Sequence, residues 1–329
     1  MTISNVAIVG AGRMGQGIAA ALAFGHVAVS VVDLRDRGDG TGSYLQAVEA
    51  SIRSMLERKV ILGLLHPTDL EEVLDRVTVV SAPDALTAMS SAQLVFEAVP
   101  EIMEVKRVAL SWIENTVEDD VPIASTTSSF LVTDLYEFVS HPERFLNAHW
   151  LNPADLIPLV EISAGVHTSE LAVEATRELM IAIGKTPVTC SPSPGYIVPR
   201  LQALVMNEAA RMVAEGVASA EDIDRAVRIG FGARFSVLGL LEFIDWGGCD
   251  ILYHASNYLR GELGERFSPA ELVESNMTSG RRGISDGQGF YTFDPLTVDE
   301  YQARRTAEFA RILDALGELP RYGDLVPAT

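Results

Sequence analysis

A glycine-rich turn near the start of the chain constrains the fold more than any other feature. Three runs around it read, in order, as a strand, a helix and a second strand: Val6–Val9, Ala19–Phe24 and Val27–Val32. Gly10, Gly12 and Gly15 stand between the first strand and the helix. In this spacing the first glycine permits a tight turn, the second lets a pyrophosphate approach the backbone, and the third lets helix pack on strand. The pattern predicts a dinucleotide-binding unit, with the phosphates at the positive end of the helix.

An acidic residue closes the second strand and indicates which dinucleotide the turn binds. Asp33 stands where an acceptor for a ribose 2′-hydroxyl is expected, so it favours NAD over NADP. Arg35 and Arg37 follow closely and leave NADP open as an alternative, because either could meet a 2′-phosphate. Arg13 and Met14, inside the turn, are further candidates for contact with the cofactor.

The rest of the chain changes character near residue 190. Strand-like runs alternate with helical stretches before this point, which indicates a mostly parallel sheet covered on both faces. The segment "SPSPGY", rich in proline, serine and glycine, interrupts regular secondary structure. Four long helical patterns follow it: Arg200–Glu215, Ala220–Ile229, Asp250–Leu263 and Val298–Leu316. We therefore expect an α/β Rossmann-type N-terminal domain over 1–190 and an all-α C-terminal domain over 191–329.

Composition excludes several classes of function. The 329 residues include 25 basic and 45 acidic side chains, and a net charge of −20 argues against binding to nucleic acid or to an anionic membrane. The two cysteines, Cys190 and Cys249, form neither a disulfide framework nor a metal-binding spacing. We recognise no signal peptide and no apolar run of membrane-spanning length. The expectation is a cytoplasmic protein without a metal, acting on a small molecule.

Polar side chains with the chemistry of alcohol oxidation occur in two later stretches. "IASTTSSFLVTDL" contains Ser128, and "FLNAHWLNPADLIPLVEI" contains His149, Asn152 and Glu161. A neutral imidazole can take the hydroxyl proton while hydride leaves the same carbon, and a carboxylate can fix its tautomer. A serine beside them can donate to the developing carbonyl oxygen. Taken one at a time, the histidine and the glutamate could equally be structural.

Several motifs together resemble the 3-hydroxyacyl-CoA dehydrogenase family over about residues 3–293. They are "GAGRMGQGIA", "FEAVPEIMEVK", "STTSS", "HWLNPADLIPLVEI", "PGYIVPRL" and "MNEAARMVAEGVASAEDID", in this order. The resemblance implies NAD as cofactor and a helical C-terminal domain that forms a homodimer. It also implies roles for individual residues: His149 as base, Glu161 as its partner, Ser128 as a substrate or cofactor contact, Asn152 on the cofactor side, and Glu101 and Lys106 near the nicotinamide half.

Two segments depart from the family pattern where the substrate is expected. The family usually reads "GF-x-x-N-R" where this chain reads "GYIVPR", so Pro199 replaces an asparagine and cannot donate a hydrogen bond. The segment "GFGARFSVLGLLEFID" places Arg234 before an aromatic residue and looks more like the gulonate and carnitine dehydrogenase relatives. An arginine fork suits a free carboxylate, although Arg234 could equally be a surface residue.

A basic trio after the second strand supports the opposite choice of substrate. Arg53, Arg58 and Lys59 fall where acyl-CoA members use basic residues on CoA phosphates, although an exposed helix face explains them as well. The leading hypothesis is NAD-dependent oxidation of a short-chain (S)-3-hydroxyacyl-CoA. One alternative is a dehydrogenase of a non-CoA hydroxy acid or carboxylate-bearing alcohol, of gulonate, carnitine or pyridine-carboxylate type. Another is a crystallin-like or NAD-sensing binder without turnover.

Overall fold

The computed structural model describes residues 3–321 and divides into two compact units. The first unit is Met1–Met206 and the second unit is Asn207–Thr329. The sequence pattern placed the boundary near residue 190, whereas the division falls inside helix α8 (Val198–Ala214). The first turns of α8 therefore belong with the sheet. In the described part of the chain, no helix is both long and apolar enough to cross a membrane.

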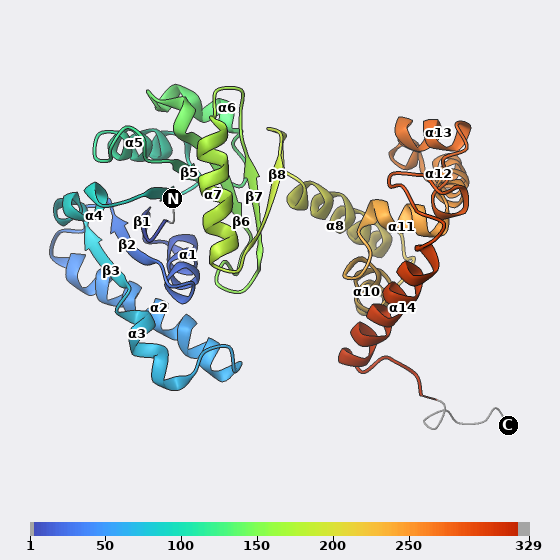
Figure 1. Ribbon diagram of the computed structural model, residues 1–329, viewed down its shortest axis with the longest axis horizontal. Coiled ribbons are helices and arrows are strands. Elements are labelled where there is room, and N and C mark those ends of the chain that lie inside the picture. Colours follow the sequence, from blue (N-terminus) through green and yellow to red (C-terminus); the bar gives the residue numbers. More distant parts are fainter. Residues whose placement is uncertain (1–2, 322–329) are drawn as a thin grey trace. The chain divides into compact units, whose positions relative to one another are not determined.

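The first unit is built on one eight-stranded sheet, in the order β3-β2-β1-β4-β5-β6-β7-β8 (Figure 1). Its strands are β1 (Asn5–Val9), β2 (Ala28–Asp33), β3 (Val77–Ser81), β4 (Leu94–Glu97), β5 (Ile123–Ser125), β6 (Phe145–Trp150), β7 (Leu159–Ser163) and β8 (Thr186–Cys190). All neighbouring strands are parallel except β6 and β7, which run antiparallel. This confirms the mostly parallel, Rossmann-type sheet and adds one antiparallel pair that the sequence did not reveal.

Helices cover both faces of the sheet, as expected for strands that are apolar on both sides. One face packs against α1 (Arg13–Phe24), α2 (Thr41–Ile61), α3 (Leu70–Leu74) and α7 (Glu170–Ala182). The other face packs against α4 (Leu86–Ser90), α5 (Met103–Glu114) and α6 (Val132–Leu135). The two buried clusters meet no solvent at their centres, since Ile8, Phe96 and Leu110 are 0% exposed.

The glycine turn between β1 and α1 forms as the sequence predicts. Gly10 has φ +122°, and a Cβ there would lie 2.5 Å from the backbone of Ala98. A Cβ on Gly15 would lie 1.9 Å from the Gly10 carbonyl oxygen. Gly12 differs, because a Cβ there would meet no described atom within 4 Å. The fold itself requires the first and third glycines, and the space above the second is left to a ligand.

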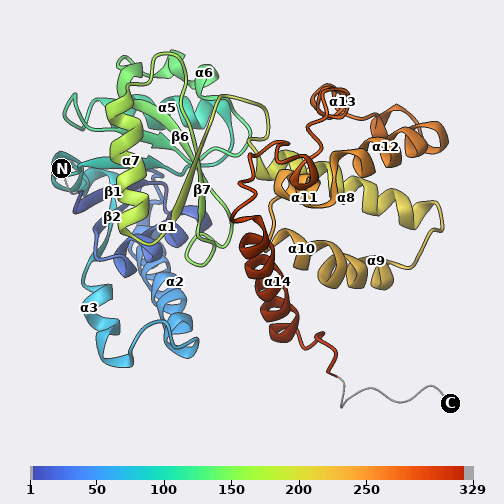
Figure 2. The same ribbon diagram turned by 45° about the vertical axis from the view of Figure 1, so that its right-hand side comes forward.

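The second unit is helical, which confirms the all-α expectation (Figure 2). After α8 it contains α9 (Ala220–Ala226), a π-helix (Val227–Gly232), α10 (Ala233–Phe235), α11 (Leu240–Gly247), α12 (Cys249–Leu263), α13 (Glu271–Thr278) and α14 (Val298–Ala315). The predicted helix over 220–229 is interrupted, because its last turns widen into the π-helix. The predicted helices over 250–263 and 298–316 agree with α12 and α14 to within one residue at each end.

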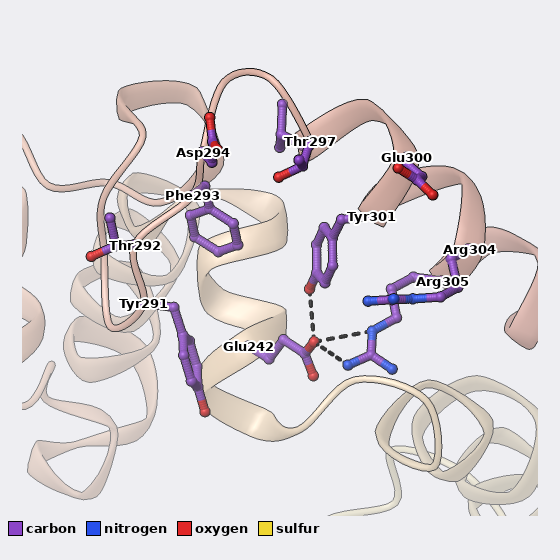
Figure 3. A pocket seen from close by; sticks show the side chains of 11 residues that line it. Glu242, Tyr291, Thr292, Phe293, Asp294, Thr297, Glu300, Tyr301, Arg304 and Arg305 are labelled. Carbon is purple, nitrogen blue, oxygen red and sulfur yellow. Dashed lines mark hydrogen bonds and ion pairs between the residues drawn. The ribbon is translucent and has the colours of Figure 1, made fainter.

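Charged and aromatic side chains connect α11 to α14 around a cavity of about 590 Å³ (Figure 3). Glu242 of α11 accepts from the Tyr301 hydroxyl at 2.7 Å and from the Arg305 guanidinium at 2.6 Å. Its other oxygen accepts from the Gly239 amide at 3.1 Å. Burial and the Glu242 carboxylate together raise the pKa of Tyr301 to about 12, so its hydroxyl remains a donor. The carboxylate is thus satisfied within the second unit.

Candidate active site

The antiparallel β6–β7 pair places His149 directly opposite Glu161. The two residues are 7% and 0% exposed, and His149 Nδ1 lies 2.7 Å from Glu161 Oε2. A carboxylate only accepts hydrogen bonds, so Nδ1 carries the proton and Nε2 keeps a free lone pair. The other oxygen, Glu161 Oε1, accepts from the amides of Ile197 and Val198 at 2.9 and 2.8 Å. The carboxylate is therefore held at both oxygens, and the imidazole is oriented with Nε2 free to accept a hydrogen bond.

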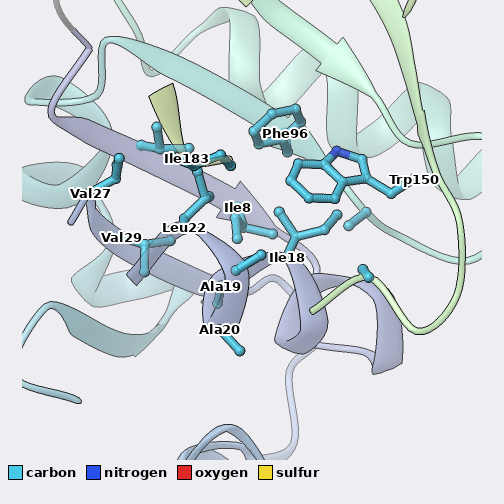
Figure 4. Packing of buried hydrophobic residues seen from close by; sticks show 14 of the residues in the cluster. Ile8, Ile18, Ala19, Ala20, Leu22, Val27, Val29, Phe96, Trp150 and Ile183 are labelled. Atoms are coloured by element: carbon cyan, nitrogen blue, oxygen red, sulfur yellow. The ribbon is translucent and has the colours of Figure 1, made fainter. Parts of the chain in front are cut away.

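The residue after the histidine anchors β6 in the core. Successive side chains of a strand point to opposite faces, so Trp150 enters the apolar cluster while His149 faces the other way. The indole of Trp150 packs edge-on against Phe96, with ring centroids 5.7 Å apart and planes at 86° (Figure 4). Ile18 of α1 lies in the same cluster. Trp150 is 2% exposed, and this packing holds the strand that carries His149.

A pocket of about 350 Å³ opens at the imidazole, within the first unit. Its lining contains Arg13, Met14, Thr126, Ser128, His149, Trp150, Leu151, Asn152, Pro199 and Gln202. Six of these residues were singled out in the sequence, Pro199 as a departure from the family pattern. Gln202 was missed, although it follows Pro199 by three positions and so shares its face of α8. Its side-chain amide is a polar group near the place where the expected asparagine is absent.

Glu101 organises the loop that carries Ser128. Its Oε1 accepts from the Thr127 hydroxyl at 2.5 Å, from the amides of Ser128 and Ser129 at 3.0 and 2.9 Å, and from the Ser129 hydroxyl at 2.8 Å. Burial alone would raise the pKa of Glu101, but the nearby Lys106 ammonium and these donors lower it to about 2. The carboxylate therefore stays ionised and holds the loop.

Lys106 lies beneath this loop and contacts two carboxylates. It is 0% exposed, with its Nζ 3.0 Å from both oxygens of the buried Glu97 and 3.2 Å from Glu101. Glu97 also accepts from the Ser125 hydroxyl at 2.5 Å. Every polar atom of this buried ion pair has a partner, which a charge removed from water requires. Lys106 is therefore connected to the loop of Ser128 through its ion pair with Glu101.

The residues expected to bind the cofactor fit a dinucleotide. Gly12 caps α1 without a side-chain hydrogen bond, so the first amides of the helix are free to donate to phosphates. Asp33 ends β2 and is 6% exposed. Its carboxylate already accepts from Arg37 Nε at 2.5 Å, and the Arg37 guanidinium lies 3.3 Å from the centroid of the Tyr44 ring. A ribose that reached Asp33 would have to share it with Arg37.

Two buried lysines hold the turn that follows Asn152. Lys185 Nζ donates to the carbonyls of Ala154 and Ile157, each at 2.7 Å, and Lys59 Nζ donates to the Asp155 carbonyl at 2.7 Å. Burial, together with the neighbouring Lys59 charge, lowers the pKa of Lys185 to about 8. Burial also lowers the pKa of Lys59. These contacts occupy Lys59, which the sequence offered as a candidate for CoA phosphates.

The remaining basic candidates lie apart from the pocket lining. Arg53 makes a two-pronged ion pair with Glu71, at 2.6 and 2.9 Å. Arg58 is exposed on α2 and has no carboxylate partner within residues 3–321. Arg234 is exposed on α10 of the second unit, with its guanidinium 5.6 Å from the Phe243 ring centroid. Arg58 and Arg234 are therefore the members of this group whose charge is available to a ligand.

Family models match almost the whole chain. The 3-hydroxyacyl-CoA dehydrogenase NAD-binding domain matches residues 5–193, and the C-terminal domain of the same family matches residues 195–293. Both matches follow the sheet-containing part and the helical part in the order expected. They connect the glycine turn and the His149–Glu161 pair to one family.

Individual relatives extend over similar lengths. A 5-formyl-3-hydroxy-2-methylpyridine 4-carboxylate 5-dehydrogenase of Mesorhizobium japonicum is 31% identical over 94% of this chain and 97% of its own length. A probable 3-hydroxybutyryl-CoA dehydrogenase of Deinococcus radiodurans is 30% identical over 87% of this chain and 99% of its own. A solved 3-hydroxyacyl-CoA dehydrogenase of Archaeoglobus fulgidus has a TM-score of 0.76 at 30% identity, covering 96% of this chain and 99% of that one.

Proposed function

The chain belongs to the 3-hydroxyacyl-CoA dehydrogenase family and is an NAD-dependent oxidoreductase, and from this premise we propose that it oxidises a secondary alcohol with His149 as base. The observation that carries the proposal is the buried His149–Glu161 pair at the edge of a pocket. A protein that only binds NAD needs the glycine turn and has no use for a base oriented by a carboxylate. Neither the site nor the relatives support a binder without turnover.

The chain's own residues divide the work of the reaction. The Nε2 lone pair of His149 takes the proton of the substrate hydroxyl, and Glu161 stabilises the imidazolium that results. Ser128 lines the same pocket and can donate to the oxygen that becomes a carbonyl. The nicotinamide of bound NAD supplies the acceptor for the hydride. Glu101 keeps the loop of Ser128 fixed while the charge moves.

An absorbance assay tests the proposal directly. NADH formation would be followed with (S)-3-hydroxybutyryl-CoA, longer 3-hydroxyacyl-CoAs and a set of free hydroxy acids. With the substrate that responds, His149→Ala should lower kcat by about 10²–10⁴-fold, the range of general base catalysis. NAD binding, measured by calorimetry, should be nearly unchanged because the glycine turn is intact. Turnover by His149→Ala at the wild-type rate would remove this residue from the mechanism.

Two substrate classes follow from different observations. The 3-hydroxybutyryl-CoA dehydrogenase relatives support a short-chain (S)-3-hydroxyacyl-CoA. The internal contacts of Arg53 and Lys59 leave only Arg58 of the basic trio available for CoA phosphates. The pyridine-carboxylate dehydrogenase relative supports an alcohol that carries a free carboxylate, as does the Arg234 guanidinium, which has no carboxylate partner among residues 3–321. The CoA ester remains the first candidate, and the exposed Arg234 makes the carboxylate-bearing alcohol the second.

Matched substitutions separate the two classes. If Arg234 binds a carboxylate, Arg234→Lys should raise KM for the free acid by about tenfold or more, because lysine cannot reproduce the fork. Arg58→Gln should then have no effect. If the protein recognises the CoA phosphates through Arg58, Arg58→Gln should raise KM for the CoA ester and weaken the dependence of KM on salt. Arg234→Lys should then have a KM near that of the wild type.

We also propose that the chain forms a homodimer, as the family resemblance implies. Helix α8 has no buried residue, and Leu204 and Met206 are 62% and 67% exposed on it. Apolar side chains gathered on one helix are typical of an interface. Light scattering should give twice the mass of the chain, and Leu204→Glu should shift the protein toward monomer. A monomeric wild type at micromolar concentration would contradict this proposal.

A further inference from the structure

Tyr196 contacts His149 directly, although the proposed reaction steps assign it no role. Tyr196 lies between β8 and α8 and is 6% exposed. Its ring stacks on the imidazole of His149, with centroids 4.8 Å apart and planes at 13°. A parallel aromatic face limits rotation of the imidazole and stabilises positive charge on it.

The hydroxyl of Tyr196 connects two further parts of the site. It donates to the Thr127 carbonyl at 2.8 Å and accepts from Asn147 Nδ2 at 3.1 Å. Thr127 immediately precedes Ser128, and Asn147 lies two residues before His149 on β6. Burial raises the pKa of Tyr196, so the hydroxyl stays protonated and remains a donor.

The backbone at this position holds the carboxylate partner as well. Tyr196 has φ +46°, in the left-handed region that is unusual for a bulky residue. This turn directs the next two amides, of Ile197 and Val198, to Glu161 Oε1. One residue and its neighbours therefore contact the base, the carboxylate and the serine loop. Such unusual backbone persists where surrounding contacts determine it, often at functional sites.

We propose that Tyr196 is a positioning residue of the reaction: its ring holds the imidazole of His149, and its hydroxyl holds the loop of Ser128 at a fixed distance from that imidazole. Pro199, three residues later, has no side-chain donor, whereas the Tyr196 hydroxyl is a side-chain donor from the same segment to the serine loop. The inference rests on the proposed role of His149 as base, and the experiment below separates the two.

Two substitutions separate the effect of the Tyr196 hydroxyl from that of its ring. Tyr196→Phe keeps the ring and removes the hydroxyl, and it should lower kcat by about three- to tenfold, the effect of one lost hydrogen bond. Tyr196→Leu removes the stack, and it should lower kcat by about 10²-fold through a misplaced base. KM for NAD should stay near wild type in both. Tyr136→Phe is the matched control, since Tyr136 also lies against a histidine, His167, away from the pocket.

Nuclear magnetic resonance of the imidazole gives a readout that needs neither substrate nor cofactor. The His149 ring resonance, assigned by its loss in His149→Ala, would be titrated with pH in each variant. Loss of the aromatic face should move the midpoint to lower pH by about half a unit in Tyr196→Leu. The ionisable groups near this ring include Glu161 on β7, the Cys190 thiol on β8, Arg13 in the pocket lining on α1 and Glu101 beside the serine loop, and all stay unchanged in these variants.

A double-mutant cycle distinguishes positioning from a general structural role. If the ring of Tyr196 acts through His149, adding Tyr196→Leu to His149→Ala should lower the residual rate by no more than the effect of the lost hydroxyl, about three- to tenfold. A full 10²-fold loss in that background would overturn the inference, as would wild-type kcat for Tyr196→Leu while His149→Ala is inactive. Wild-type kcat for His149→Ala would instead overturn the proposed function, and the ring titration would still report whether Tyr196 controls the imidazole.

Discussion

The two units of this chain are stabilised by different means. The first unit contains both clusters of buried apolar side chains that occur within residues 3–321. It also contains all three lysines of the chain, Lys59, Lys106 and Lys185, and each of them is buried with an internal acceptor. The second unit carries arginines paired with carboxylates that are half-buried or exposed, such as Arg305 with Glu242 and Arg266 with Glu208.

This difference shows that the first unit buries its apolar side chains more completely than the second unit does. A sheet with apolar residues on both faces buries them under its own helices, so the first unit completes its core within one chain. In the second unit Ile251 and Tyr258 of α12 are 63% and 69% exposed. Ion pairs on a surface contribute little to stability, so the second unit depends more on what covers its apolar faces. The predictions below test this contrast.

The largest effect is expected at the tightest backbone contact of the first unit. Gly15→Ala would place a Cβ 1.9 Å from the Gly10 carbonyl oxygen, and backbone cannot move aside as a side chain can. The free energy of unfolding should fall by more than about 3 kcal/mol, at the upper end for overpacked sites. Urea unfolding followed by circular dichroism measures this.

Gly12→Ala is the matched control for that prediction. Its Cβ would meet no described atom within 4 Å, so unfolding should be unchanged. NAD affinity, measured by calorimetry, should nevertheless fall by about tenfold or more, because the pyrophosphate approaches the backbone at the second glycine. Equal losses of stability in the two variants would contradict the structural distinction between these glycines.

A smaller effect is expected from the buried charge of Lys185. The pKa of about 8 lies below its ordinary value of 10.5, so between these values the unfolded chain binds more protons than the folded protein. The stability of the wild type relative to Lys185→Met should therefore rise between pH 8 and 10.5, by up to about 3 kcal/mol. Denaturant titrations at pH 7.5, 9 and 10.5 check this. A difference that is constant across the range would refute the burial effect.

The smallest effect is expected in the second unit. Glu242→Gln replaces the carboxylate that Tyr301 and Arg305 share with a neutral amide, and it should cost about 1–2 kcal/mol. Arg304→Met is the control, because Arg304 lines the same cavity without an ion pair among the described residues. Thermal unfolding compares the two variants. A loss for Glu242→Gln as large as that for Gly15→Ala would remove the contrast between the units.

The sequence predicted those parts of the fold whose cause is local. Glycine spacing and strand hydrophobicity specify the β1–α1–β2 turn, and helical periodicity predicted α14 (Val298–Ala315) to within one residue. Asp33, Ser128 and His149 became candidates because each follows or ends an apolar run, where functional residues of parallel sheets often lie. Family membership and the NAD cofactor were confirmed by the matches to known proteins.

Features that depend on distant packing were beyond sequence reasoning. Only the family resemblance paired Glu161 with His149, because the antiparallel register that sets them opposite each other leaves no sign in the intervening turn. Burial of Lys59 depends on the contact of α2 with the turn after Asn152, far away in the chain. Charge patterning alone therefore made Lys59 look like a surface residue. The π-helix after α9 likewise has no signature that periodicity could detect.

The two hydrogen bonds from the amides at the start of α8 to Glu161 determine where the chain can be truncated to give an NAD-binding fragment with an intact site. An isolated NAD-binding half that stopped at residue 193, where the first family match ends, would lack Tyr196, Ile197 and Val198. Its Glu161 would lose two hydrogen bonds and its imidazole would lose the stacked ring, although sheet and glycine turn stayed whole. Such a fragment should bind NAD but hold the His149 imidazole less firmly, so a fragment that keeps the site intact has to extend beyond residue 198 into the first turns of α8.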